Sequence, residues 1–192
     1  MLHRQKIILA LLDHAAKPLS RTMFVKLSFL LRAETEVGKD SAYYDFVPYQ
    51  FGPFSFVLYR EIEALKDQSY VVENDDKFSL ATPAACEVRS LVAGLPPSVR
   101  SSIGHIASRY GSKAQKTLVR DVYARYPWYA TKSELKDLLP PTMPALPSAS
   151  LAVYTVGYER ISVDAFFDRL LHAGIRGIAD VRANPISRKY GF

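Results

Sequence analysis

The chain has 192 residues, a formal net charge of +6, and 48% hydrophobic and 12% aromatic residues. This composition excludes an intrinsically disordered protein and is typical of a globular protein with one large domain or two small ones. No apolar stretch approaches the ~20 residues that a membrane-spanning helix needs, and a single cysteine excludes an internal disulfide framework. We therefore expect a cytoplasmic protein with no membrane partner.

Helices dominate the first part of the chain. The segment HRQKIILALLDHA repeats apolar residues at helical spacing, and TMFVKLSFLLRAE does the same after Ser20, a residue type that caps helix N-termini. The aromatic-rich segment YYDFVPYQFGPFS is interrupted by two prolines and a glycine. It therefore predicts a short strand and a turn rather than a helix.

The next elements complete a recognisable order. A helix is predicted over roughly Phe54 to Asp67, and YVVENDDKFSLA predicts a β-hairpin around an Asn-Asp-Asp turn. Further helices are predicted over 83–93, 97–110, 113–125 and 133–139. Helix, helix, strand, helix and hairpin is the order of a winged helix-turn-helix, so residues 1–138 are predicted to form a winged-helix-like helical domain.

A change of pattern separates the second part. The segment LPPTMPALPSAS, residues 139–150, is rich in proline and predicts an extended linker. After it, LAVYTVGY and IRGIADV predict two strands, and the helix SVDAFFDRLLHAG between them is capped by Ser162 and ends at Gly174. Residues 151–192 therefore predict an incomplete parallel βαβ unit, and the whole chain an α+β fold.

The predicted DNA-reading helix has the wrong charge for DNA. Its charged residues, Arg60, Glu61, Glu63, Lys66 and Asp67, sum to −1, and the wing turn ENDDK is also acidic. Phosphate repulsion makes both elements poor DNA contacts. Nucleic acid would instead meet basic residues of the following helices, for which a solvated surface is the alternative interpretation. These residues are Arg100, Arg109, Lys113, Lys116, Arg120 and Arg125.

Three motifs in the first part, KLSFLL, YDFVPYQFGPFSFVLYREIEAL and VYARYPWYATKSEL, carry a resemblance over residues 3–138. They resemble the bacterial winged-helix-like family that includes the Panacea antitoxin domains, although Phe51 stands where that family often has tyrosine. The resemblance implies a domain that works through protein contacts, including toxin neutralisation. The structural alternative for Tyr49, Phe51 and Phe54 is ordinary core packing around the Gly-Pro turn.

The ends of the two predicted parallel strands would share one rim, where ligands of such sheets bind. The guanidinium groups there suit a phosphate-bearing ligand, and Asp180 or Glu159 could serve as an acid or base in hydrolysis. Alternatively, Asp180 and Arg182 form a structural ion pair beside a solvated loop. The predicted phosphate-binding residues are Gly157, Tyr158, Arg182, Asn184, Ser187 and Arg188.

The same segment resembles the start of the domain-of-unknown-function-488 family. The matching pattern is T-x-G-Y, then F-x-x-L-L, then D-V-R-x-x-P-x-S-R ending in an aromatic residue, from Thr155 to Phe192. The resemblance implies a compact α/β domain with a nucleotide-related or nucleic-acid-related binding or hydrolytic role. Because that family continues beyond the matched pattern, we expect residues 151–192 to be either the first part of a longer α/β domain or a part completed by another chain.

Three functional hypotheses follow. The first is a regulatory or nucleic-acid-associated protein whose helical domain recruits a protein partner and whose α/β rim binds a nucleotide or another phosphate-bearing ligand. The second is a hydrolase acting on nucleotides or nucleic acid, so enzymatic activity stays open. The third is an antitoxin-like protein-binding module. No cofactor or metal is predicted, because the four histidines and the cysteine are dispersed and no cofactor motif is present.

Overall fold

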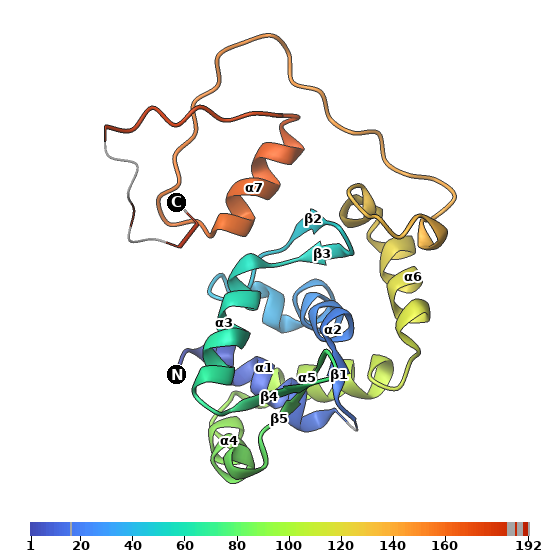
Figure 1. The fold of residues 1–192 in the computed structure, drawn as a ribbon, viewed down its shortest axis with the longest axis vertical. Coiled ribbons are helices and arrows are strands. Elements are labelled where there is room, and N and C mark those ends of the chain that lie inside the picture. The colour runs from blue at the N-terminus through green and yellow to red at the C-terminus, as the bar shows by residue number, and fades with distance from the viewer. Residues whose placement is uncertain (16, 184–186, 188–189, 192) are drawn as a thin grey trace.

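The computed structural model describes residues 1–15, 17–183, 187 and 190–191, which form an α+β protein (Figure 1). None of the helices in these ranges is long and apolar enough to cross a membrane. The helices are α1 (His3–His14), α2 (Arg21–Glu34), α3 (Phe56–Asp67), α4 (Ala85–Ala93), α5 (Pro97–Tyr110), α6 (Gln115–Arg125) and α7 (Val163–His172). The strands are β1 (Leu19–Ser20), β2 (Val47–Tyr49), β3 (Gly52–Phe54), β4 (Val71–Asn74) and β5 (Lys77–Leu80).

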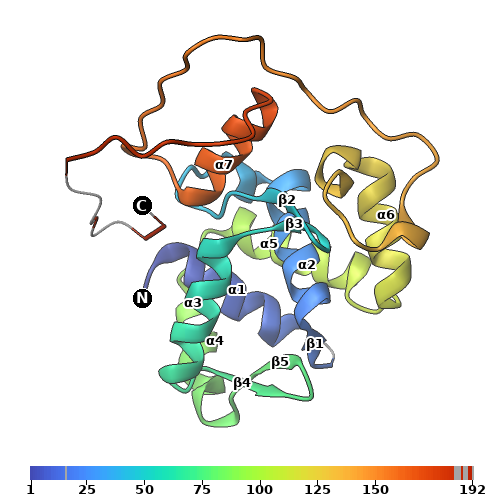
Figure 2. The same ribbon diagram turned by 45° about the horizontal axis from the view of Figure 1, so that its top comes forward.

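Helices α1 and α2 form the centre of the hydrophobic core. The residues of α1 from Ile7 to Leu12 are all buried, which is expected of a helix that neighbours cover on every side. Helices α4 and α5 pack on α1, while α5 and α6 pack on α2 (Figure 2). Helix α2 begins at the predicted cap, since Ser20 Oγ accepts a hydrogen bond from the Met23 amide at 3.2 Å. Both predicted helices are confirmed.

A small antiparallel sheet with the order β1-β5-β4 packs beside these helices. Strands β4 and β5 are the predicted hairpin. Asp75 and Asp76 have φ values of 50° and 58°, as a two-residue turn matching the right-handed twist of the strands requires. Strand β1 joins the sheet because Leu19 pairs with Phe78. The sheet therefore connects the start of α2 to the hairpin that follows α3.

A second hairpin, β2–β3, leads directly into α3. At Gly52, φ is +92°, and a Cβ atom there would lie 2.4 Å from Cε1 of Tyr123, so this position needs glycine. Pro53 follows, and the Ser55 side chain caps α3 by accepting a hydrogen bond from the Leu58 amide at 3.2 Å. We call residues 52–55 the Gly-Pro turn. It fixes the N-terminus of α3 beside the hairpin.

The last part of the chain returns to the helical core. Residues 139–162, which include the predicted linker, contain no helix or strand and arc over the molecule (Figure 1). Helix α7 forms where it was predicted. Ser162 Oγ accepts a hydrogen bond from the Ala165 amide at 3.0 Å, and Gly174 follows the helix with φ +72°. Because α7 packs against β2 and α3, the tail lies on the helical part of the molecule.

The two strands predicted on either side of α7 do not form. Residues 151–157 and 175–183 have no strand pairing, and the side chains of Leu151 and Val153 are almost fully exposed. A parallel pair needs covering elements on both of its faces, and α7 packs on the β2–β3 hairpin and α3 instead. The predicted helix over 133–139 is also shorter, being a single 3₁₀ turn at Lys136–Leu138.

Candidate functional site at the Gly-Pro turn

A lysine from α2 lies buried beside the Gly-Pro turn. Lys26 is 2% exposed, and its Nζ donates a hydrogen bond to the carbonyl oxygen of Pro53 at 3.1 Å. Burial disfavours the charged ammonium and lowers its pKa to about 7. No ion pair to Lys26 occurs among the described residues. Buried amines with a perturbed pKa are concentrated at functional sites, which makes Lys26 a candidate site residue.

An aspartate from α7 lies where the same turn joins α3. The carboxylate of Asp164 is fully buried at the N-terminus of α3. It accepts hydrogen bonds from the Phe56 amide at 2.7 Å, the Val57 amide at 3.1 Å and Ser55 Oγ at 2.9 Å. These amides have no partner within α3, and the helix dipole favours a negative charge there. The Gly-Pro turn therefore binds a carboxylate supplied by a distant segment.

Two opposing effects act on this carboxylate. Burial raises the pKa of Asp164 to about 6, while the three hydrogen bonds act in the opposite direction. Near neutral pH the carboxylate is mostly ionised but close to its titration range. Mild acidification therefore protonates Asp164 and should strengthen the contact between α7 and α3, because the raised pKa means that the folded state binds this proton more tightly.

Further polar contacts hold both ends of α7 in place. At its start, Ser162 Oγ donates a hydrogen bond to Asp45 Oδ2 at 2.7 Å. Towards its end, Trp128 Nε1 donates to Asp168 Oδ1 at 3.0 Å, and the Trp128 ring stacks on His172 with 3.8 Å between centroids. Helix α7 is thus fixed by directional contacts at several points along its length.

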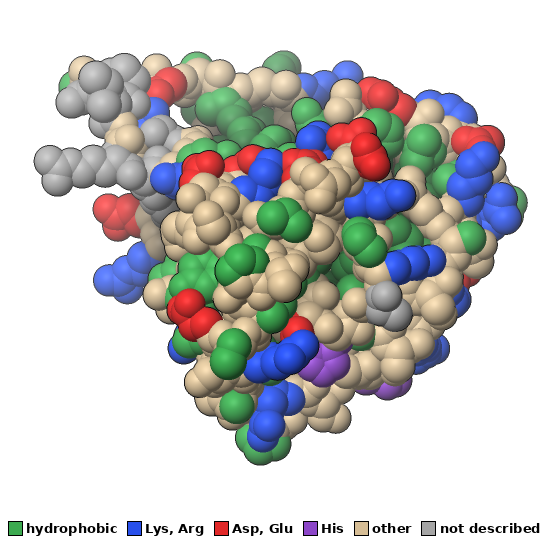
Figure 3. All heavy atoms as spheres, turned by 60° about the horizontal axis from the view of Figure 1, so that its bottom comes forward, with side chains coloured by type: hydrophobic (Ala, Val, Ile, Leu, Met, Phe, Trp, Pro, Cys, Tyr) green, Lys and Arg blue, Asp and Glu red, His purple; other side chains and the backbone are tan. Residues whose placement is uncertain are grey.

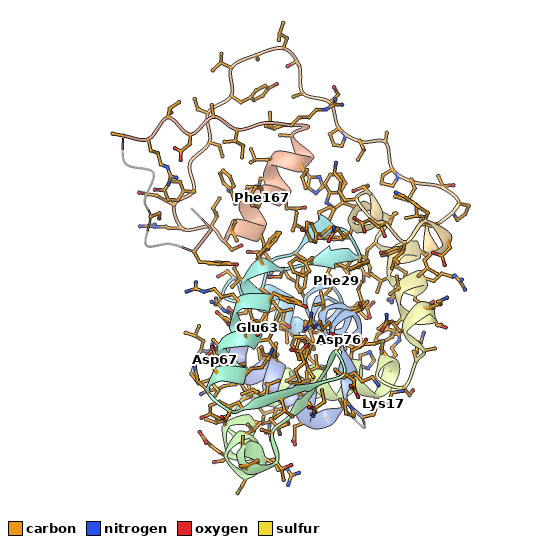
Figure 4. The ribbon with its side chains drawn as sticks, in the orientation of Figure 1. Lys17, Phe29, Glu63, Asp67, Asp76 and Phe167 are labelled. Carbon is orange, nitrogen blue, oxygen red and sulfur yellow. The ribbon has the colours of Figure 1, made fainter. Side chains whose placement is uncertain are left out.

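Aromatic side chains extend the site across its surface. Figure 4 shows Phe167 on the side of α7 near the β2–β3 hairpin, and its ring centroid lies 6.4 Å from that of Phe56. Tyr49 is 39% exposed and Phe51 is 49% exposed, so neither packs in the core. Both line a groove of about 580 Å³ that Lys26 also borders. The core-packing interpretation of Tyr49 and Phe51 is therefore wrong, because the hairpin turns them outwards.

The predicted phosphate-binding residues are not gathered at the edge of a sheet. Without the two strands, Gly157 and Tyr158 are not placed at a sheet edge beside Arg182, although the Arg182 guanidinium lies 5.2 Å from the Tyr158 ring centroid. Ser187 is half-buried. The predicted residues Asn184 and Arg188 lie outside the described residues. Of the predicted residues, Tyr158 and Arg182 thus lie in contact with each other.

Asp180 and Arg182 form the structural pair that was the alternative interpretation. The Arg182 Nε donates to both carboxylate oxygens of Asp180, at 2.8 and 3.0 Å, and Nη2 donates at 2.6 Å. The guanidinium holds the pKa of Asp180 at about 2. A carboxylate that stays ionised and paired is poorly suited to general acid or base chemistry near neutral pH. The other candidate, Glu159, is exposed.

The six basic residues of the predicted nucleic-acid surface differ in their surroundings. Lys113 forms an ion pair with Asp121, and Arg125 with Glu34. Arg109 lies over the Tyr110 ring, with 5.2 Å from its Cζ to the ring centroid. The other three, Arg100, Lys116 and Arg120, are exposed. On the face of the molecule that Figure 3 shows, basic side chains are interspersed with acidic and apolar ones rather than gathered in one patch.

Sequence reasoning missed Lys26, Ser55 and Asp164 as site residues. A signal for Lys26 was available, because it lies one helical turn from the apolar residues Met23 and Leu30, on the face that the pattern predicts to be buried. Asp164 carried no such signal. An acidic residue in the first turn of a helix is explained locally by its own helix dipole.

Comparison with protein-family models, curated proteins and solved structures found no match for this chain.

Proposed function

We propose that this chain is a regulatory protein whose helical domain recruits a protein partner by binding an acidic, amphipathic helix at the Gly-Pro turn. The observation that carries the proposal is the burial of Asp164, whose carboxylate accepts three hydrogen bonds at the start of α3. In this chain α7 occupies the site. Its pattern of a capping serine, an acid two residues later and paired phenylalanines describes the helix that the site binds.

The connection of α7 to the rest of the chain favours exchange. Residues 139–162 contain no helix or strand, so α7 is attached as a tethered ligand. A tether raises the effective concentration of its own helix without making that helix irreplaceable. A partner helix with the same pattern can therefore compete for the Gly-Pro turn, and the competition would make recruitment regulated.

A winged-helix interpretation of the helical domain is supported by its element order. Helices α1, α2 and α3 and strands β1, β4 and β5 follow one another as in that fold. Helix α3 would then be the DNA-reading helix, yet Glu63 and Asp67 lie exposed along it (Figure 4) and α7 packs against it. Negative charge and partial coverage favour a protein partner over DNA.

The other hypotheses have less support. A hydrolase would need an available acid or base, and Asp180 is held ionised by Arg182. The antitoxin-like module shares the proposed interface and differs only in the partner. These hypotheses and the two family resemblances stay predictions.

Competition with a peptide tests the proposal. A fluorescent peptide of residues 158–176 is titrated with the parent chain and with the full-length Asp164→Ala variant. We expect the variant to bind the peptide at least ~10-fold more tightly, because its own α7 no longer fills the site. A peptide carrying Asp164→Ala should bind neither chain, and a chain with Glu159→Ala should behave like the parent. Equal binding of both peptides would refute carboxylate recognition at the Gly-Pro turn.

A further inference from the structure

A second cavity lies between the helical core and the segment that leads into α7. Its volume is about 730 Å³, within the range of small-molecule sites. One wall comes from α1, α2 and α3, and the other from residues 160–169. Both views of the ribbon place α7 beside the N-terminal end of α3, at this junction (Figures 1 and 2).

The lining of this cavity is strongly basic. Two of its five arginines are neutralised: Arg4 pairs with Glu61 and Arg32 with Asp45. The other three arginines have no carboxylate partner among the described residues. They are Arg60, Arg160 and Arg169.

One polar atom in the lining lacks a hydrogen-bond acceptor. Nη2 of Arg32 lies 2.8 Å from Asp45 Oδ1, but Nη1 of the same guanidinium is buried, and no acceptor for it occurs among the described residues. Because this nitrogen is buried, a ligand in the cavity does not reach it, and Arg32 contributes to the lining as a residue held in place by Asp45.

Arginines arrayed around a concave site suit a phosphate group. Each planar guanidinium can donate two parallel hydrogen bonds, and the tetrahedral phosphate offers oxygens to several guanidinium groups at once. The Arg60 guanidinium already stacks on the ring of Tyr190, 4.5 Å from its centroid, so the lining also provides an aromatic surface. Duplex nucleic acid is too large for a cavity of this volume.

We propose that this cavity binds a small organic phosphate, whose phosphate group is held by Arg60, Arg160 and Arg169. The site is distinct from the predicted rim around Arg182. It requires α7 to be docked, because Arg160 and Arg169 come from α7 and the segment before it. Because its two walls come from the helical core and from the segment entering α7, a bound ligand would connect them and stabilise the folded chain.

Calorimetric titration of the full chain tests the proposal, with inorganic phosphate, pyrophosphate and ADP as probes at constant ionic strength. We expect saturable binding of one ADP per chain, and weaker binding of inorganic phosphate. Arg60→Gln and Arg169→Gln should each weaken ADP binding at least ~10-fold. Arg176→Gln removes the same charge from an exposed position that does not line the cavity, and should leave binding within about twofold.

Three results would overturn the proposal. The first is no saturable binding of any probe, and the second is an equal loss of ADP affinity in the Arg176→Gln control. The third is inorganic phosphate binding as tightly as ADP, which would show that the organic group is not recognised. Thermal unfolding of each variant without ligand verifies folding. Arg60 lies exposed on α3, so its variant keeps the test valid if a substitution in residues 160–169 weakens α7 packing.

Discussion

Asp164 and Phe56 are 108 residues apart in the sequence, yet Asp164 Oδ1 accepts a hydrogen bond from the Phe56 amide at 2.7 Å. This contact attaches α7, which follows the long segment 139–162, to the start of α3, which follows the Gly-Pro turn. Within that turn, Lys26 donates a hydrogen bond to the carbonyl oxygen of Pro53. The same few residues therefore connect α2, α3 and α7.

Replacing Asp164 should release α7. We expect Asp164→Ala to weaken α7 docking by ~1–3 kcal/mol, because three donors at the start of α3 lose their acceptor. The only tryptophan, Trp128, stacks on His172 of α7, so its fluorescence emission reports docking. Glu159→Ala removes an exposed acid and is the matched control. Unchanged Trp128 emission in Asp164→Ala during urea titration would contradict the prediction.

Docking of α7 should depend on pH through Asp164. The pKa of this carboxyl is raised from 3.8 to about 6 in the folded protein, so between these values the folded state binds more protons than the unfolded state. Its contribution is therefore fully present below about pH 4 and is lost as pH rises through 6. Urea unfolding followed by Trp128 emission, at pH values from 4 to 7, measures the slope of the docking free energy against pH. The slope should be smaller in Asp164→Asn, and an identical slope would assign it to another group.

Lys26 should give the opposite dependence at alkaline pH. Its pKa is lowered from 10.5 to about 7, so the unfolded state binds more protons between these values. Stability should rise across this window by on the order of 1 kcal/mol per pH unit. In Lys26→Met the rise should disappear, whereas Lys17→Met, at an exposed lysine labelled in Figure 4, should keep it. Urea unfolding from pH 7 to 10 is the measurement.

The basic residues after α4 should divide into structural and solvated groups. Arg125→Gln should destabilise the protein by up to ~1 kcal/mol, because Arg125 pairs with Glu34 at a partly exposed position. Lys116→Gln should have a smaller effect, because that side chain is exposed and forms no ion pair within the described ranges. Urea unfolding at low salt measures the free energy of unfolding of both variants. Equal effects of the two substitutions would contradict this division.

Nucleic acid should bind this chain weakly. Two of the six predicted contact residues are already paired with carboxylates, and the face in Figure 3 mixes both charge signs. Fluorescence anisotropy with duplex DNA, single-stranded DNA and RNA should give a shallow dependence on salt, because few phosphates would be neutralised. Tight binding with a steep salt dependence would instead assign a nucleic-acid role to this surface.

The sequence by itself determined the local elements. The capping residues Ser20 and Ser162, the Asp75-Asp76 turn and the end of α7 at Gly174 are all where the pattern predicts them. Each depends on residues within a few positions along the chain, because a cap or a two-residue turn satisfies the backbone groups beside it. The α+β class follows from these elements.

Only the tertiary structure decided how the distant segments meet. The sequence pattern predicted strands on both sides of α7 and a shared rim at their ends, but apolar runs become parallel strands only when other elements cover them. Asp164 has the appearance of an ordinary first-turn acid of its own helix. It becomes a site residue because α7 docks on α3, where burial and three hydrogen bonds act on its carboxylate. Such a contact arises from packing across the whole chain, and no local pattern encodes it.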